Sequence, residues 1–369
     1  MEQGPKKRSA VKSVAVIAVV IVLVLLLLTP AVQGFLKDLI QSPFQPRYPE
    51  SATFELQRTM SVDANGGEVL NYTFDICEPI TIAQNGYTIQ DVRSITYAPA
   101  ISTRDVRYGH NWVAWYGAPF AGQQTRTCTA TYEVTVYTHI WNIDRSKSLN
   151  VSDIPSSLRS TYLHDEWKMN MTSPEIVTAS RSIVGTETNV YQILRDIYVW
   201  MTDNVNYPTG TSGGEPQEAE VTLASRVGDC DDQSILFCSL ARAAGVPAWL
   251  QMGALFVSAE NSWGGHGWLQ AYIPLKSGGG ENITIDVVNK DFLVFRPNRF
   301  VDFTDDGEGS HLSDYYYTFF TTYRGASPQY SEEYVKISYE ESSKKISQGA
   351  VYELADLRQV GTVRAPTRR

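Results

Sequence analysis

The sequence lacks the features that define several classes of protein. It has only four cysteines in 369 residues, too few for a disulfide scaffold, and no internal repeat. Positive charge is scarce: 31 Lys and Arg residues stand against 40 Asp and Glu residues, and four of the 31 lie within the first twelve positions. A chain this acidic has no basic surface for a phosphate backbone, so we expect no nucleic-acid partner. With 43% hydrophobic residues it is not disordered, and its length allows two domains.

A long apolar run occurs once, near the N-terminus. Residues 14–32 form a stretch of nineteen residues that is close to the length of a membrane-spanning helix. Basic residues flank only its N-terminal side, which predicts a cytoplasmic tail at 1–13, a transmembrane anchor in the lipid bilayer at 14–32 and an extracellular body. A cleaved signal peptide is the alternative, although no clear Ala-x-Ala site follows the run. Prolines at 43 and 46 predict a stalk over residues 33–47.

Residues 48–150 carry the pattern of antiparallel strands. Alternating and β-branched segments occur at 53–61, 68–74, 88–97 and 127–141, with Asn-Gly turns between them. This pattern predicts an N-terminal β-sandwich domain. Cys77 and Cys128 each lie in a stretch with strand character, and in an oxidising compartment we expect these two to form a disulfide.

Beyond residue 150 the apolar spacing becomes helical. Ser173 and Pro174 begin one helix, and a second is predicted from Cys230 to Ala244, ended by Gly245. Two strands follow at 267–273 and 282–288, joined by a glycine-rich turn. Helices first and antiparallel strands afterwards predict an α+β domain over residues 151–330, with 314–320 as a last core strand or helix. Residues 331–369 are polar, which predicts a C-terminal tail.

The helix predicted to begin at Cys230 places a thiol in its first turn. Unpaired backbone N–H groups and the helix dipole favour a thiolate there, which predicts a lowered pKa and faster alkylation at Cys230 than at Cys238. Neighbouring aspartates oppose the thiolate, so a cationic partner such as a histidine is required. Cys238 lies within the apolar part of the same helix and is interpreted as core packing.

His266 is the best placed of the five histidines. It stands at the start of a predicted strand with glycines on both sides, where another element can approach its ring. Asp286 interrupts the apolar run of the next strand, which is unfavourable unless its carboxylate is hydrogen-bonded. Both residues lie ten positions from Lys276, so a hairpin brings them to one side of the sheet, with a register uncertain by about two residues. Together with Cys230 they supply a nucleophile, a base and an orienting acid for acyl transfer.

Three segments carry a family resemblance: GDCDDQSILFCSLARAAGVPAWL, GGHGWLQAYIP and ITIDVVNKDF. Over about residues 170–290 the chain resembles the transglutaminase-like superfamily, whose core is a papain-like Cys-His-Asp thiol fold. The resemblance implies that Cys230 attacks a carboxamide, that His266 is the base and that Asp286 orients it, while Asp232 braces the fold. The family often has Asp-Pro-Thr after the third residue, whereas here Asn289 follows three positions later, so either Asp286 or Asn289 orients the base.

We therefore expect a membrane-anchored extracellular thiol enzyme that transfers or hydrolyses an acyl group of a protein or peptide substrate through a thioester. The alternatives are a transglutaminase-like scaffold that has lost its activity and a peptidase with no transferase activity. No cofactor is expected. Acidic clusters at 231–232 and 302–308 could suggest a metal site, but neither follows a calcium-loop spacing.

Overall fold

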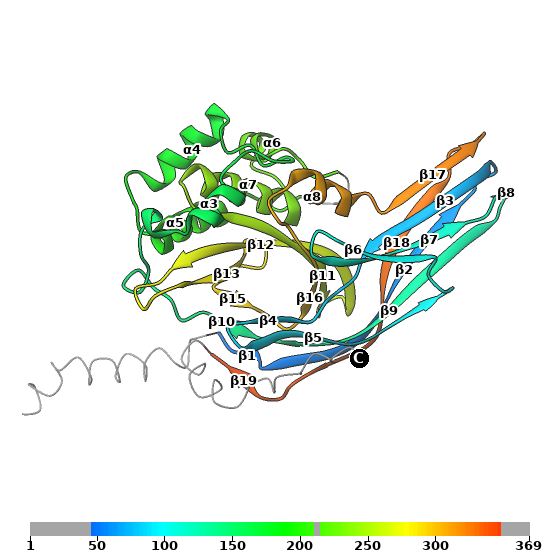
Figure 1. The fold of residues 1–369 in the computed structure, drawn as a ribbon, viewed down its shortest axis with the longest axis horizontal. Coiled ribbons are helices and arrows are strands. Elements are labelled where there is room, and N and C mark those ends of the chain that lie inside the picture. The colour runs from blue at the N-terminus through cyan, green and yellow to red at the C-terminus, as the bar shows by residue number, and fades with distance from the viewer. Residues whose placement is uncertain (1–45, 210–214, 348–369) are drawn as a thin grey trace, which may run out of the picture. The chain divides into compact units, whose positions relative to one another are not determined.

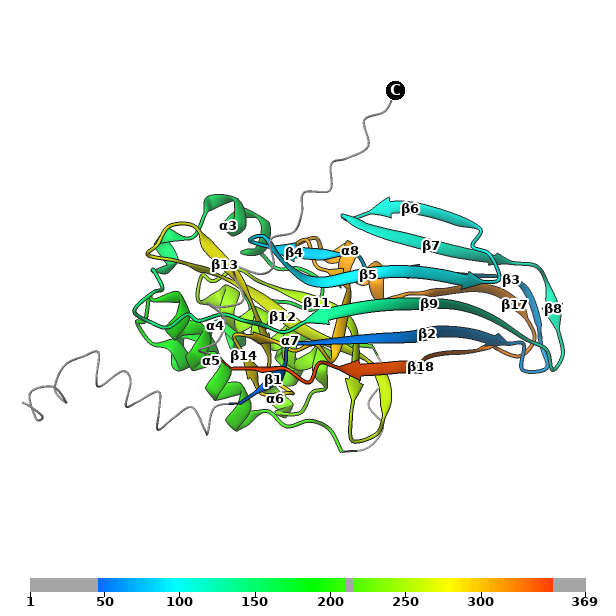
Figure 2. The same ribbon diagram turned by 90° about the horizontal axis from the view of Figure 1, so that it is seen from below.

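The computed structural model describes residues 46–209 and 215–347 (Figures 1 and 2). No helix in these two ranges combines the length and the apolar character needed to cross a bilayer. The predicted cytoplasmic tail, the anchor at 14–32 and most of the stalk lie outside the described residues.

Two antiparallel sheets of five strands form the all-β part of the chain (Figure 2). The first sheet has the order β18 (Gln329–Glu341), β2 (Ser51–Asp63), β9 (Thr125–Tyr137), β5 (Tyr87–Ala98), β4 (Ile82–Gln84). The second has the order β17 (Phe319–Arg324), β3 (Glu68–Cys77), β7 (His110–Gly117), β6 (Thr103–Arg107), with β8 (Phe120–Ala121) on β3. Alternate residues of β2 are buried, because one face of the strand covers the core.

The polar tail predicted from residue 331 is wrong for its first part. Strand β18 pairs along the whole of β2, from Gln329 opposite Asp63 to Glu341 opposite Ala52, and β19 (Lys345–Ile346) pairs with β1 (Tyr48–Pro49). The composition misleads because β18 is an edge strand with one face in solvent, where polar residues are favoured. The sandwich is thus built from both ends of the described chain.

The mixed helix and sheet architecture predicted for the second half is confirmed. Its five-stranded sheet has the order β14 (Asp291–Phe292), β13 (Gly280–Asp286), β12 (Ser262–Pro274), β11 (Ala248–Val257), β16 (Arg299–Thr304), and β10 (His139–Ile140) pairs separately with β15 (Val294–Phe295). The helices are η2 (Val151–Asp153), α3 (Ser156–Tyr162), α4 (Pro174–Val184), α5 (Val190–Asn204), α6 (Ala219–Ser225), α7 (Cys230–Ala243) and α8 (Gly309–Tyr316). Figure 1 shows α4 to α7 on one side of this sheet and the strands β4 and β5 on the other.

One hydrophobic core joins the sandwich to the second half of the chain. Phe54 of β2 lies 4.6 Å from Trp263 of β12 and 6.2 Å from Phe300 of β16, measured between ring centroids. Tyr132 of β9 also packs against Phe300, at 5.9 Å. The predicted boundary at residue 150 therefore marks a change of secondary structure and not the edge of a separate core.

The predicted disulfide between Cys77 and Cys128 is wrong. All four cysteines are free thiols. Cys77 ends β3 and its thiol donates to the carbonyl oxygen of Asp302 at 2.9 Å, whereas Cys128 lies on β9 of the other sheet, opposite Met60. Both strand assignments are right, but the pairing depends on how the two sheets stack, which local sequence patterns do not specify.

Candidate active site

Helix α7 begins at Cys230, as the sequence predicts, because Asp229 caps it. The Asp229 carboxylate accepts the backbone N–H of Asp232 at 3.4 Å, and the Asp232 carboxylate accepts the N–H of Asp229 at 3.1 Å, which is a reciprocal capping box. After Ala243 the chain turns at Gly245, whose φ of 84° is favourable only for glycine. The thiol of Cys230 is thereby held at the N-terminal end of a buried helix.

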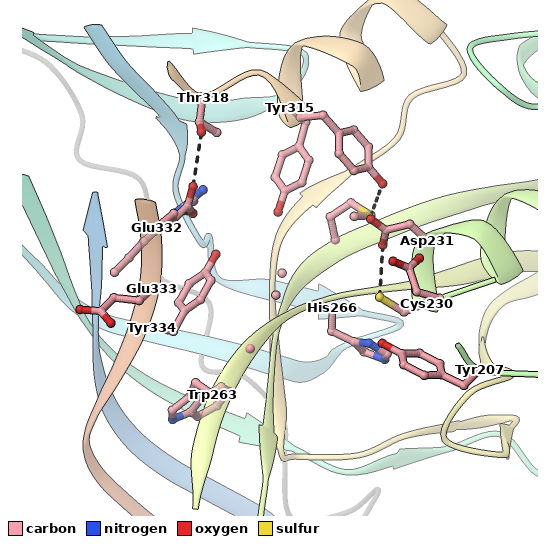
Figure 3. Close-up of a pocket in the computed structure, with 17 residues that line it drawn as sticks. Tyr207, Cys230, Asp231, Trp263, His266, Tyr315, Thr318, Glu332, Glu333 and Tyr334 are labelled. Carbon is pink, nitrogen blue, oxygen red and sulfur yellow. Dashed lines mark hydrogen bonds and ion pairs between the residues drawn. The ribbon is translucent and has the colours of Figure 1, made fainter. Parts of the chain in front are cut away.

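Cys230 and His266 both line one pocket of about 580 Å³ (Figure 3). The far wall of this pocket comes from the sandwich, through Arg58 of β2 and Glu332 of β18. Arg58 is held there by ion pairs to Glu332 at 2.6 Å and to Asp302 at 3.4 Å. The lining also includes five tyrosine and tryptophan side chains, namely Tyr207, Trp263, Tyr315, Tyr316 and Tyr334. No local pattern in the sequence indicates that the sandwich contributes to this pocket.

The structure brings His266 and Asp286 into direct contact. The Nε2 atom of His266 lies 2.8 Å from Oδ2 of Asp286, and both side chains are buried. The two strands pair with Leu269 opposite Ile285, so Asp286 lies two residues from a position directly opposite His266, on the same face of the sheet. Asp286 engages Nε2, which leaves Nδ1 for another partner, and Figure 3 shows both His266 and Cys230 in the pocket that they line.

Asn289 also reaches the imidazole, with Nδ2 at 3.1 Å from Nε2 of His266. Its amide nitrogen is a donor and also donates to Oδ2 of Asp286 at 2.9 Å, while its backbone N–H donates to Oδ1 at 3.0 Å. An Nε2–H group needs an acceptor, which the Asp286 carboxylate provides and an amide nitrogen does not. The geometry therefore favours Asp286 as the orienting group and Asn289 as its support.

Arg299 is a residue that the sequence analysis missed. It is fully buried on β16 and donates to Oδ2 of Asp286 at 2.5 Å and to Oδ2 of Asp291 at 3.0 Å. Burial by itself would raise the pKa of Asp286, but the interactions of its carboxylate with His266 and with the guanidinium of Arg299 outweigh it and hold that pKa well below its usual value. Asp286 is therefore an anion near neutral pH. An arginine within the segment RPNRFVDF carries no local signal of this role.

The prediction of a lowered pKa at Cys230 is wrong for the resting site. Burial raises the pKa of the thiol well above its usual value, and the carboxylate of Asp231, whose Oδ1 accepts the S–H at 3.5 Å, raises it further. The backbone N–H of Gly267 also donates to the sulfur and lowers the pKa, but it does not compensate. The helix N-terminus favours a thiolate, yet desolvation and adjacent carboxylates are the larger effects here.

Asp231 has an unusual environment for an acid. Burial raises its pKa to about 6, and Asp229 contributes in the same direction. The hydroxyl of Tyr316 donates to its carboxylate. Gly267 leaves room for this carboxylate, because a Cβ at that position would lie 2.3 Å from Oδ1 of Asp231. The sequence predicts that another element approaches the chain closely at the glycines beside His266. That element is the start of α7, and Asp231 makes the approach.

Asp232 lies where the expected bracing role requires it. Its carboxylate accepts the backbone N–H of Gln217 at 2.7 Å and the side-chain amide of Gln217 at 2.6 Å, which ties the loop before α6 to the start of α7. Among the other acids considered for a metal, Asp302 pairs with Arg58 and Asp305 lies 3.6 Å from Arg242. Both of these carboxylates therefore form ion pairs with buried arginines. Cys238 is fully buried in the core, as its spacing indicated.

A thiol at a helix N-terminus, a histidine on the neighbouring sheet and a buried carboxylate behind it define the papain-like class of thiol folds. Residues 177–281 match the family model of the transglutaminase-like superfamily. No curated protein gives a significant sequence match.

Two solved structures show how far the similarity extends. A proposed cysteine protease from Cytophaga hutchinsonii is 17% identical, with a TM-score of 0.56 over 79% of this chain and 93% of its own. At that identity the likeness shows a shared fold. The periplasmic domain of TgpA from Pseudomonas aeruginosa is 11% identical, with a TM-score of 0.33 over 66% of this chain and 88% of that domain.

Proposed function

We propose that this protein is a cysteine enzyme that transfers or hydrolyses an acyl group at a carboxamide or peptide carbonyl. Cys230 is the nucleophile, His266 the general base and Asp286 the residue that orients the imidazole. The observation that carries the proposal is the contact of 2.8 Å between His266 and Asp286 in a pocket that also contains the Cys230 thiol. The superfamily match of the core supports the same chemistry.

The raised pKa of Cys230 determines how the first step proceeds. The thiol is protonated at rest, so His266 accepts the proton at Nδ1 as the sulfur attacks the carbonyl carbon. The anionic Asp286 stabilises the resulting imidazolium. The backbone N–H of Cys230 lies in the first turn of α7 and has no acceptor within the helix, and we propose that it donates to the developing oxyanion.

The intermediate then collapses to a thioester. The C–N bond breaks, and the imidazolium returns its proton to the departing nitrogen, which leaves as ammonia or an amine. Water or a primary amine next attacks the thioester carbonyl with His266 as base, releasing an acid or a new amide and restoring the thiol. Which acceptor prevails depends on how the occupied pocket excludes water.

Replacement of the nucleophile tests the proposal. Cys230→Ala is expected to abolish turnover of peptide and carboxamide substrates and selective labelling by a thiol-directed activity probe, whereas the matched control Cys128→Ala keeps both. Full activity in Cys230→Ala would refute the assignment. Absence of selective labelling in the unmodified protein would favour the alternative, a transglutaminase-like binding scaffold. Incorporation of a fluorescent primary amine into product distinguishes a transferase from a peptidase.

We also propose that residues 14–32 anchor the protein in the cell membrane with its body outside. The apolar run and the basic residues before it support this orientation. The expected result is that the full chain stays with membranes during alkaline extraction, and that protease added to intact cells digests the body. Release into the supernatant would instead indicate a cleaved signal peptide.

A further inference from the structure

Strand β12 has a partner along only part of one edge. Its first edge pairs with β11 from Ser262 to Ala271. Its second edge pairs with β13 only from Leu269 to Pro274. Among the described residues, no strand pairs with the second edge between Ser262 and Trp268. This open stretch contains Gly265 and His266, and it therefore runs directly past the proposed base.

The hydrogen-bond pattern of β11 shows which main-chain groups face the open edge. The N–H of Phe256 donates to the carbonyl of Asn298 at 2.8 Å, so the main chain of Phe256 points towards β16 and away from β12. Phe256 and Trp263 therefore lie opposite each other without exchanging main-chain hydrogen bonds. Along an antiparallel pair of strands, hydrogen-bonded and non-hydrogen-bonded pairs of residues alternate. Gly265 and Gly267 follow Trp263 at intervals of two and thus direct their N–H and C=O groups to the open edge.

Gly267 gives independent support for this assignment, since its N–H donates to the sulfur of Cys230. Gly265 lies two residues earlier, about 7 Å along the strand. It is exposed in the wall of the pocket, and a Cβ placed on it would meet no atom within 4 Å. No hydrogen bond to its N–H or C=O occurs within the described part of the chain.

We infer that the acyl donor is a polypeptide in extended conformation that pairs with the open edge of β12 through the main chain of Gly265. This inference rests on the proposed function, because it places the reacting carbonyl at Cys230. Residues that precede this carbonyl continue past Gly265 towards Trp263. Main-chain pairing of this kind recognises a peptide backbone whatever its side chains, and so distinguishes an extended polypeptide from a small amide.

A series of thiol-reactive peptides tests the inference. Acetyl-(Ala)n-chloromethyl ketones with n from 1 to 4 alkylate Cys230 as its sulfur displaces chloride and its proton passes to His266. The second-order rate constant is expected to rise about 4- to 100-fold between n of 1 and 3, because two added backbone hydrogen bonds contribute about 2- to 10-fold each. N-methylation of alternate alanines should remove about 2- to 10-fold each, and N-methylation of the intervening ones should have little effect.

Iodoacetamide, which has no peptide chain, separates the two proposals. If it labels Cys230 selectively but the rate with the ketones is independent of n, or N-methylation shows no alternation, docking on β12 is overturned and the proposed function stands. If Cys230 is not labelled selectively by either reagent, the proposed function fails and this inference fails with it.

Gly265→Pro tests the same pairing from the side of the protein, by removing a main-chain donor of β12. Proline removes the N–H of residue 265, and it is tolerated in a strand where that N–H faces away from the ladder. For each variant the rate with the n = 3 ketone is divided by the rate of the same variant with iodoacetamide, and this ratio should be about 2- to 10-fold lower for Gly265→Pro than for Gly265→Ala, which keeps the N–H. Equal ratios in the two variants would overturn the inference, and should Gly265→Pro not fold, the N-methyl series decides the matter.

Discussion

Asp231→Asn isolates the effect of one carboxylate on the proposed nucleophile. Oδ1 of Asp231 lies 3.5 Å from the sulfur of Cys230. At that separation two unit charges repel by about 1 kcal/mol in water and about 5 kcal/mol at the effective dielectric constant of a protein surface, which is about 20. Because one pKa unit corresponds to about 1.4 kcal/mol, removing the charge should lower the pKa of Cys230 by about 1 to 4 units.

The assay is the rate of alkylation of Cys230 by iodoacetamide between pH 5 and 10, followed by mass spectrometry of its peptide. Each unit of lower pKa raises the thiolate fraction tenfold but lowers its nucleophilicity about threefold, so the net gain at pH 8 is about threefold per unit. Below pH 6 Asp231 is itself protonated, because its pKa is raised to about 6, and the two proteins should then converge.

Asp203→Asn is the matched control, since it makes the same chemical change at an exposed site on α5 and should leave alkylation unchanged. Equal or slower labelling of the Asp231→Asn variant at pH 8 would refute the reasoning, and would mean that desolvation alone keeps the thiol protonated. A difference that persists below pH 6 would show that the pKa of Asp231 is not raised.

Three further results are expected. Asp286→Ala should lower kcat/KM at least about 10-fold more than Asn289→Ala, because only the carboxylate accepts the imidazole N–H; equal losses would make Asn289 the orienting group. Arg299→Met should lower the free energy of unfolding by about 3–5 kcal/mol in urea titrations, since it leaves two buried carboxylates without their cation; a loss below 1 kcal/mol would contradict this. Burial raises the pKa of Asp302 to about 7, so folding takes up a proton there and this group should lower stability by about 2–4 kcal/mol as pH rises from 4 to 7; Asp302→Asn should reduce the fall in stability by that amount.

Local patterns predicted the elements that carry the site. Apolar spacing and the Gly245 stop predicted α7 to within one residue, because these patterns act between near neighbours. The strands predicted at 267–273 and 282–288 lie largely within β12 and β13, and their glycine-rich connection placed His266 and Asp286 on one face. The four strands predicted in the sandwich also correspond to observed strands, whereas β6 and β7 were missed.

What the sequence by itself determined is therefore the identity of the three side chains and the local elements that hold them. Tertiary structure alone decided that Arg299 lies under Asp286, that β18 completes the pocket and that Cys77 and Cys128 stay apart. It also decided that the thiol of Cys230 is protonated at rest, against the prediction from its helix position. These features depend on desolvation and on contacts between residues far apart in the chain. The spacing of neighbouring residues, from which local structure is predicted, contains no information on either.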